Sequence, residues 1–132
     1  MTDSPSTRLE GQGSLILVVE DQVLIALDLA GTLEDEGYRV LGPAPTVAAA
    51  LRLLGQERPD AAVLDMNLRG EMVTPVARLL QHMNVPFVIA SADDPAFTAD
   101  DEVLVTAKHL GKPTAPALLI AAMRGLLRRE AC

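Results

Sequence analysis

The sequence predicts an α/β fold in which five parallel strands form a doubly wound sheet flanked by helices. Short apolar runs alternate five times with longer segments whose apolar residues recur every three or four positions. Polar residues directly follow most of the apolar runs, at the edge where a parallel sheet collects its strand ends. At 132 residues and 49% hydrophobic content, the chain has the size of one domain with its own core.

The first three elements precede Pro43. Leu15–Val19 is apolar at every residue, as expected of a strand that is covered on both faces. The pattern of Gln22–Gly37 is helical, and a glycine commonly ends a helix. Tyr38–Gly42 is a second short strand. The helix positions predicted to face the core are Ala26, Leu29, Ala30 and Leu33.

Two prolines then lead into the next strand–helix units. Thr46 is a good N-cap for a helix over Val47–Gly55, because its hydroxyl can accept a hydrogen bond from the first turn. Ala61–Leu64 is a third buried strand, and Met66–Thr74 is a loop. Pro75 can open another helix, since the first helical position does not need a backbone N–H. The inward face of that helix is predicted to hold Val76, Leu79, Leu80 and Met83.

The last third of the chain completes the alternation. Pro86–Ala90 is the fourth strand, and the acidic segment Ala92–Glu102 is expected to form at most a weak, mobile helix. A fifth strand falls within Val103–Leu110. The last helix is predicted to start with Thr114 as its N-cap. Its buried face is predicted to contain Leu119, Ala122, Met123 and Leu126.

Charge and aromatic content disfavour several classes of function. Lys and Arg number 11 against 18 Asp and Glu, and the resulting net charge of −7 opposes binding to nucleic acid or anionic lipid. Aromatic residues make up 2% of the chain, too few for a base-stacking surface. The single cysteine, Cys132, permits no disulfide framework and suits a reducing compartment.

The chain divides into a leader and one domain. Residues 1–13 are rich in Ser, Thr and Gly, and we expect them to form a flexible leader before a domain at 14–130. No apolar run approaches the roughly 20 residues of a membrane span, and no export signal is recognisable. We therefore expect a cytoplasmic protein without a membrane partner.

Polar residues with coherent chemistry follow four of the predicted strands: Glu20, Asp21, Asp65, Ser91 and Lys112. Carboxylate oxygens are the hard ligands that Mg²⁺ prefers, and Asp65 can also act as a nucleophile towards phosphorus. Ser91 can donate a hydrogen bond to a phosphoryl oxygen, and Lys112 can supply a positive charge. Together these groups favour phosphoryl transfer, although each of them alone is a weak signal.

The motifs that carry these residues identify a family. From Leu15 to about Leu127 the chain resembles the receiver domain of bacterial two-component response regulators, through "LILVVEDQ", "AAVLDMNLRG", "PFVIAS" and "GKP". It is most similar to single-domain receivers with a Phe-Ala-Thr-Gly-Tyr-type motif after the fourth strand, which are often associated with HWE-type histidine kinases. The resemblance implies a flavodoxin-like sheet with strand order 2-1-3-4-5.

The resemblance also assigns roles. It implies that Asp65 accepts a phosphoryl group from a histidine kinase, that Ser91 is the switch hydroxyl and that Lys112 takes the place of the invariant lysine. It further implies a cis peptide between Lys112 and Pro113. The Mg²⁺ ligands that it implies are the side chains of Glu20, Asp21 and Asp65 and the backbone carbonyl of Asn67.

Three departures from the family pattern concern the relay from the pocket to the surface rather than the phosphorylation chemistry. Ser91-Ala92-Asp93-Asp94 stands where the subgroup has Thr-Gly-Tyr-Gly, Thr114 replaces a Phe, and His109 replaces an aromatic residue. Asn67 and Asp93 would flank the phosphoryl group. They could hold a water in line with the acyl phosphate, which predicts a phosphorylated state that lasts seconds to minutes.

Output is expected to come from the receiver surface. Only five residues follow Leu127, so we expect either a contact with an unknown downstream protein or a phosphate sink, and not a turnover enzyme. The sequence leaves open whether the protein forms a homodimer. Two alternatives also remain. One is a receiver-like interaction module that is never phosphorylated. The other is a small haloacid-dehalogenase-like phosphatase, which would need a second Asp where Asn67 stands.

Overall fold

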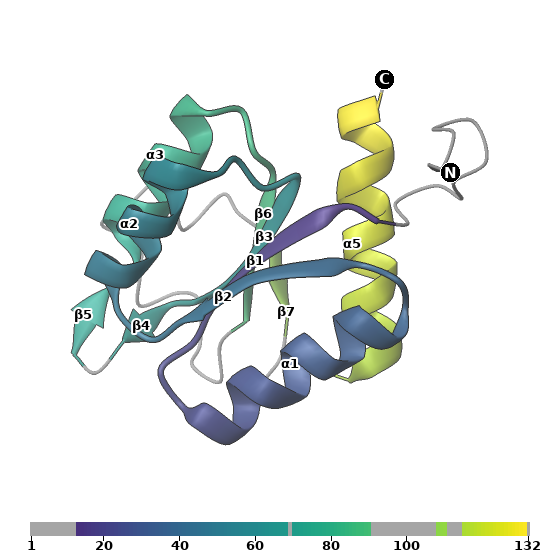
Figure 1. Cartoon of the computed structure of the whole chain (residues 1–132), viewed down its shortest axis with the longest axis horizontal. Helices are drawn as coiled ribbons and strands as arrows, with labels where there is room; N and C mark the ends of the chain where they lie inside the picture. Colours follow the sequence, from purple (N-terminus) through teal and green to yellow (C-terminus); the bar gives the residue numbers. More distant parts are fainter. Residues whose placement is uncertain (1–12, 69, 91–107, 111–114, 132) are drawn as a thin grey trace.

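The computed structural model describes residues 13–68, 70–90, 108–110 and 115–131 (Figure 1). Five parallel strands form one sheet in the order β2-β1-β3-β6-β7. This confirms the predicted doubly wound sheet and its 2-1-3-4-5 strand order. The strands are β1 (Leu15–Val19), β2 (Arg39–Ala44), β3 (Ala61–Asp65), β6 (Phe87–Ala90) and β7 (Lys108–Leu110).

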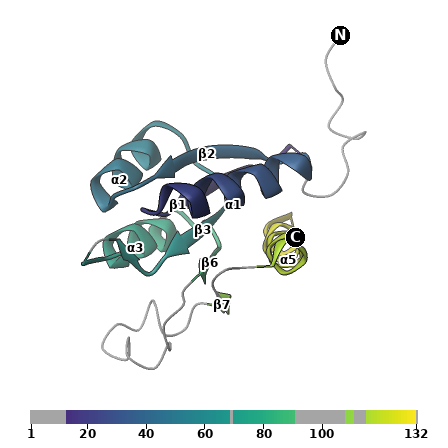
Figure 2. The ribbon, with the colours of Figure 1, turned by 90° about the horizontal axis from the view of Figure 1, so that it is seen from below.

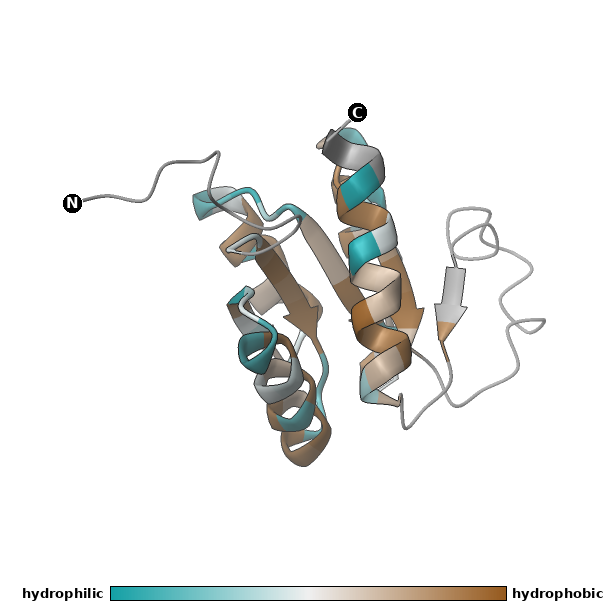
Figure 3. Ribbon diagram, turned by 90° about the vertical axis from the view of Figure 1, so that its right-hand side faces the viewer, coloured by the Kyte–Doolittle hydropathy of each residue, from teal (hydrophilic) through white to brown (hydrophobic). Residues whose placement is uncertain are grey.

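Helices cover both faces of the sheet: α1 (Val23–Asp35), α2 (Val47–Gln56), α3 (Thr74–His82) and α5 (Pro116–Ala131). Figure 2 shows α2 and α3 on one side and α5 on the other. Leu17 and Val19 of β1 belong to the core under α2 and α3, whereas Ile16 and Val18 belong to the core under α1 and α5. Alternate side chains of β1 thus enter opposite cores, which explains why every residue of that strand is apolar. Figure 3 shows the same apolar character along the central strands.

The predicted inward faces of the helices are largely confirmed. All four positions named for the first helix and all four for the last are buried. In α3, Val76 and Leu80 are buried, whereas Leu79 and Met83 are only partly buried. Ala77 is fully buried although it was not predicted to face the core. Thr46 caps α2 as predicted, because its hydroxyl accepts a hydrogen bond of 3.0 Å from the amide of Ala49.

The second strand is longer than its prolines suggest. β2 continues past Gly42 and through Pro43 to Ala44, and the Gly42–Pro43 peptide is cis. A proline is tolerated here because β2 is an edge strand, where a missing N–H costs no ladder hydrogen bond. Gly42 has φ of 99°, and a Cβ on it would lie 2.8 Å from the Ala44 nitrogen and 3.0 Å from the Val18 oxygen. Only glycine fits this position without strain.

The predicted loop at 66–74 contains a small antiparallel hairpin. Its strands are β4 (Asn67–Leu68) and β5 (Glu71–Met72), and Gly70 in the turn has φ of 88°. The last helix begins at Pro116, two residues after the predicted cap. Thr114 itself, the leader up to residue 12 and the acidic segment 92–102 lie outside the described residues. Within the described ranges, none of the helices combines the length and apolar character needed to cross a bilayer.

Candidate metal centre

Three carboxylates meet at the carboxyl edge of two adjacent inner strands of the sheet. Glu20 and Asp21 directly follow β1, and Asp65 is the last residue of β3. β1 and β3 are adjacent and parallel, with Val19 in register with Leu64. The next residues along the two strands are therefore Glu20 and Asp65, which is why positions 45 residues apart become neighbours.

The three acidic side chains are close together, and two of them are buried. One carboxylate oxygen from each of Glu20, Asp21 and Asp65 lies within 4.8 Å of the others. Glu20 is 2% exposed and Asp65 is 6% exposed, whereas Asp21 is partly exposed. Like charges at this separation repel one another, and burial adds a desolvation cost for each ionised group. A cation among these oxygens would offset both effects.

Backbone contacts hold Glu20 in position. Its amide donates a hydrogen bond of 2.9 Å to the carbonyl of Ala44, at the end of the neighbouring strand β2. Its Oε2 atom accepts a hydrogen bond of 3.1 Å from the amide of Gln22, which is the N-cap residue of α1. The side chain is thereby tied to the start of α1, where the helix dipole favours negative charge.

The hairpin determines where the backbone of Asn67 points. The amide of Val73 donates to the carbonyl of Met66 at 2.9 Å, so these two residues form a hydrogen-bonded pair. Antiparallel ladders alternate, which makes the Asn67–Met72 pair a non-hydrogen-bonded one. The N–H and C=O of Asn67 are therefore directed away from β5, and its carbonyl is available to a ligand outside the hairpin.

This set of donors fits a hard divalent cation. The three carboxylates offer oxygen ligands, and the outward-directed carbonyl of Asn67 stays the predicted fourth ligand. Mg²⁺ prefers such ligands and keeps several waters besides one or two carboxylates. The incomplete protein shell would leave coordination positions for water and for a phosphoryl oxygen.

Several residues singled out in the sequence lie outside the described residues. These are Ser91, Asp93, Lys112 and Thr114, together with the Lys112–Pro113 peptide. Ala90 is in register with Asp65 and with Leu110, so the chain leaves β6 and β7 at the same edge as the acidic group. His109 lies within β7, opposite Ile89 of β6.

Sequence reasoning missed an apolar surface beside the acidic group. Val23, Leu24 and Leu27 are 66%, 82% and 59% exposed, and their spacing places them on one side of α1. We call these three residues the α1 apolar patch. The signal was present in the sequence, because all three are large apolar residues outside the predicted inward face. The patch begins two residues after Asp21.

Comparisons with known proteins agree on one family. The family model described as the response regulator receiver domain matches residues 16–124. The transcriptional regulatory protein PdtaR of Mycobacterium tuberculosis is 30% identical over 78 residues, covering 58% of this chain and 38% of PdtaR. The phyllosphere-induced regulator PhyR of Methylorubrum extorquens is 30% identical over 126 residues, covering 88% of this chain and 47% of PhyR. The chain thus spans less than half the length of either relative.

A solved structure points to the same family. The signal receiver domain of a modulated diguanylate cyclase from Desulfovibrio desulfuricans G20 superposes with a TM-score of 0.81 at 28% identity. The match covers 91% of this chain and 98% of that domain. The similarity therefore extends over nearly the whole of both chains.

Proposed function

The chain belongs to the family of response regulator receiver domains, and from that premise we propose that Asp65 accepts a phosphoryl group from a histidine kinase in a Mg²⁺-dependent reaction. Membership confirms the family predicted from the strand-end motifs, whereas the link to HWE-type kinases stays a prediction. The observation that carries the proposal is the grouping of Asp65 with Glu20 and Asp21 within 4.8 Å at one edge of the sheet.

The proposed step is a transfer between two nucleophiles. A carboxylate oxygen of Asp65 attacks the phosphorus of the donor phosphohistidine, the P–N bond breaks, and the electron pair returns to the imidazole nitrogen. An acyl phosphate on Asp65 results. Mg²⁺ held by the acidic group and the Asn67 carbonyl would supply positive charge at the transferring oxygens. We assign Ser91 a hydrogen bond to a phosphoryl oxygen and Lys112 a countercharge, as the family resemblance implies.

The α1 apolar patch supports a protein donor. Large apolar groups that stay exposed together commonly mark a contact with another protein. Val23, Leu24 and Leu27 start two residues after Asp21, so a kinase resting on them would be next to the acidic group. We propose that the kinase docks on this patch while its phosphohistidine reaches Asp65.

Output from the domain is proposed to be a protein contact or the withdrawal of phosphoryl groups from a kinase. In the first case, phosphorylation shifts a conformational equilibrium by giving Ser91 and Lys112 an anion to bind. We propose residues 14–130 as the receiver, preceded by a leader at 1–13, in a cytoplasmic signalling protein. Its relatives PdtaR and PhyR are named as regulators, which supports a signalling role.

Intact-mass measurement with acetyl phosphate and Mg²⁺ tests the proposal. We expect wild-type protein to gain the mass of one phosphoryl group, and Asp65→Asn protein, or wild type in excess chelator, to gain none. No adduct under any condition would favour an interaction module that is never phosphorylated. Steady turnover of phosphate esters would instead point to a phosphatase.

A further inference from the structure

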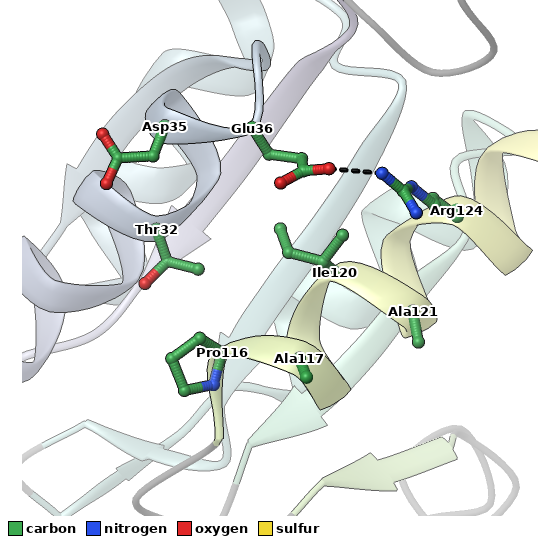
Figure 4. Close-up of a pocket in the computed structure, with 8 residues that line it drawn as sticks. All are labelled: Thr32, Asp35, Glu36, Pro116, Ala117, Ile120, Ala121 and Arg124. Atoms are coloured by element: carbon green, nitrogen blue, oxygen red, sulfur yellow. Dashed lines mark hydrogen bonds and ion pairs between the residues drawn. The ribbon is translucent and has the colours of Figure 1, made fainter.

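A groove runs between α1 and α5 on the face of the molecule that carries both helices (Figure 4). Its volume is about 550 Å³. The α5 side is apolar, with Ile120 projecting into the space between the helices. The α1 side carries two carboxylates, so the groove combines an apolar wall with an acidic one. The lining residues that matter here are Thr32, Asp35, Glu36, Pro116, Ala117 and Ile120.

The acidic wall carries more negative charge than its surroundings neutralise. α1 ends in Glu34 and Asp35 with Glu36 as its cap, and its last turn contains no basic residue. The negative end of the helix dipole adds to these charges. Arg124 of α5 forms an ion pair with Glu36 across the groove (Figure 4). No residue in the described part of the chain bonds to the exposed side chain of Asp35.

The chain enters the described structure at one end of this groove. The amide of Gly13 donates a hydrogen bond of 2.9 Å to the carbonyl of Gly37, the residue after Glu36. Arg39 fixes the same point, because its Nε donates to the Gly13 carbonyl at 3.0 Å. Gly13, the point at which residues 1–12 join the described structure, therefore lies beside the acidic wall.

We propose that the leader binds in this groove of its own chain, with Arg8 at Asp35 and Leu9 against Ile120. Arg8 and Leu9 are adjacent in sequence, so the leader presents a cation beside an apolar group. The groove presents a carboxylate beside an apolar wall. Arginine suits this pairing, since its guanidinium binds carboxylates through two parallel hydrogen bonds.

The tether between Arg8 and the described structure is comparable in length to the groove. Five residue steps separate Arg8 from Gly13 and can span up to about 17 Å when extended. The groove follows α5 from Pro116 to Arg124, eight steps or about 12 Å of helix. The extended tether is therefore longer than the stretch of α5 that lines the groove.

A tethered segment has two advantages over a second copy of the protein. Tethering gives the leader an effective concentration on the order of millimolar, which a separate molecule would have to match by its own affinity. Two copies would also each carry a net charge of −7, which opposes their association. The leader carries Arg8 together with Asp3 and Glu10, so its side chains total −1, and the repulsion it meets is much smaller than that of a second copy.

Paramagnetic relaxation enhancement in the full-length chain tests the proposal. A nitroxide is attached through Ser6→Cys in a Cys132→Ser background, and amide signals are compared with and without reduction of the label. We expect a several-fold larger enhancement at Thr32, Ile120 and Ala121 than at Ala49 and Gln81 on the opposite layer.

Charge-reversal variants distinguish specific binding of the leader in the groove from its mere proximity to it. Asp35→Lys should reduce the enhancement along the groove, and Asp35→Lys combined with Arg8→Glu should restore it. Asp28→Lys is the matched control, because Asp28 is an exposed α1 aspartate that does not line the groove. Ile120→Ser should reduce the enhancement, whereas Leu118→Ser, on the exposed side of α5, should not.

Two results would overturn the proposal. One is an enhancement along the groove that Asp35→Lys and Asp28→Lys change equally. The other is enhancement of isotope-labelled protein by spin-labelled protein mixed with it, because this would assign the groove to a second copy. Neither result depends on phosphorylation of Asp65, so the proposed function stands or falls separately.

Discussion

At the scale of single residues, the acidic group explains why a cation should matter to stability as well as to chemistry. Glu20 and Asp65 are buried, and Asp21 lies beside them. Without a cation, their mutual repulsion persists in the folded state and weakens in the unfolded chain, where the charges separate. Removing one charge therefore reduces the repulsion in the folded protein while it removes a predicted metal ligand.

Asp21→Asn should show the relief of charge repulsion and the loss of cation binding as two separate effects on stability. In chelator, we expect its free energy of unfolding to exceed that of wild type by about 1–3 kcal/mol, because the close like-charge contacts of Asp21 with Glu20 and Asp65 are removed. Added Mg²⁺ should stabilise wild type strongly and the variant weakly. Urea denaturation with and without Mg²⁺ measures both effects. Equal stabilisation of the two proteins by Mg²⁺ would argue against Asp21 as a ligand.

Two residues expected beside the phosphoryl group should control how long it survives. If Asn67 and Asp93 hold the attacking water, Asn67→Ala and Asp93→Ala should each slow autodephosphorylation. The phosphorylated fraction can be followed by intact mass after removal of acetyl phosphate, starting from equally phosphorylated samples. Rates that match wild type in both variants would discard the idea.

Gly42 is a residue whose identity the backbone requires. Gly42→Ala should lower the free energy of unfolding by about 1–3 kcal/mol, since its φ of 99° is strained for alanine and the new Cβ meets the backbone of Ala44 and Val18. Gly31→Ala is the matched control, because a Cβ on this α1 residue would contact nothing within 4 Å. Alanine in a helix interior should instead stabilise by about 0.5–1 kcal/mol. Urea denaturation that ranks the two variants in the opposite order would contradict this account.

At the scale of elements, α1 has two distinct surfaces. Its inner side packs Leu29 and Leu33 into the core, while Leu24 and Leu27 remain exposed near the acidic group. A core helix does not need large apolar side chains on its solvent side. The α1 apolar patch is therefore best explained by a partner, and in the proposed function that partner is the kinase.

Leu24→Glu tests whether the exposed side of α1 binds the kinase while its inner side stabilises the fold. Leu24 is 82% exposed, so the change should leave the fold and the rate of phosphorylation by acetyl phosphate unchanged. Phosphotransfer from the phosphorylated cognate kinase should slow at least tenfold, because a charge would enter an apolar contact. Leu118→Glu, on the exposed side of α5, is the control that should leave both rates unchanged. A loss of acetyl phosphate reactivity in Leu24→Glu would indicate damage to the site itself.

At the scale of the whole molecule, the architecture was predictable because its signals are local and repeated. A fully apolar strand such as Leu15–Val19 and the spacing of Leu29 and Leu33 in α1 each report burial from sequence alone. Boundaries were less predictable where tertiary position overrides local preference. β2 runs through Pro43 because it lies at the sheet edge, a position that the strand's own sequence does not specify.

The candidate site was likewise predictable in part. Which carboxylates could meet followed from their positions after β1 and β3, since parallel strands end at a common edge. Their distance, the 2% exposure of Glu20 and the outward carbonyl of Asn67 depend on register and on the hairpin, which arise from contacts between distant segments. The groove between α1 and α5 also depends on contacts between distant segments. Helix periodicity says which side of each helix is buried, but only the packing angle of the two helices on the sheet leaves a space between them.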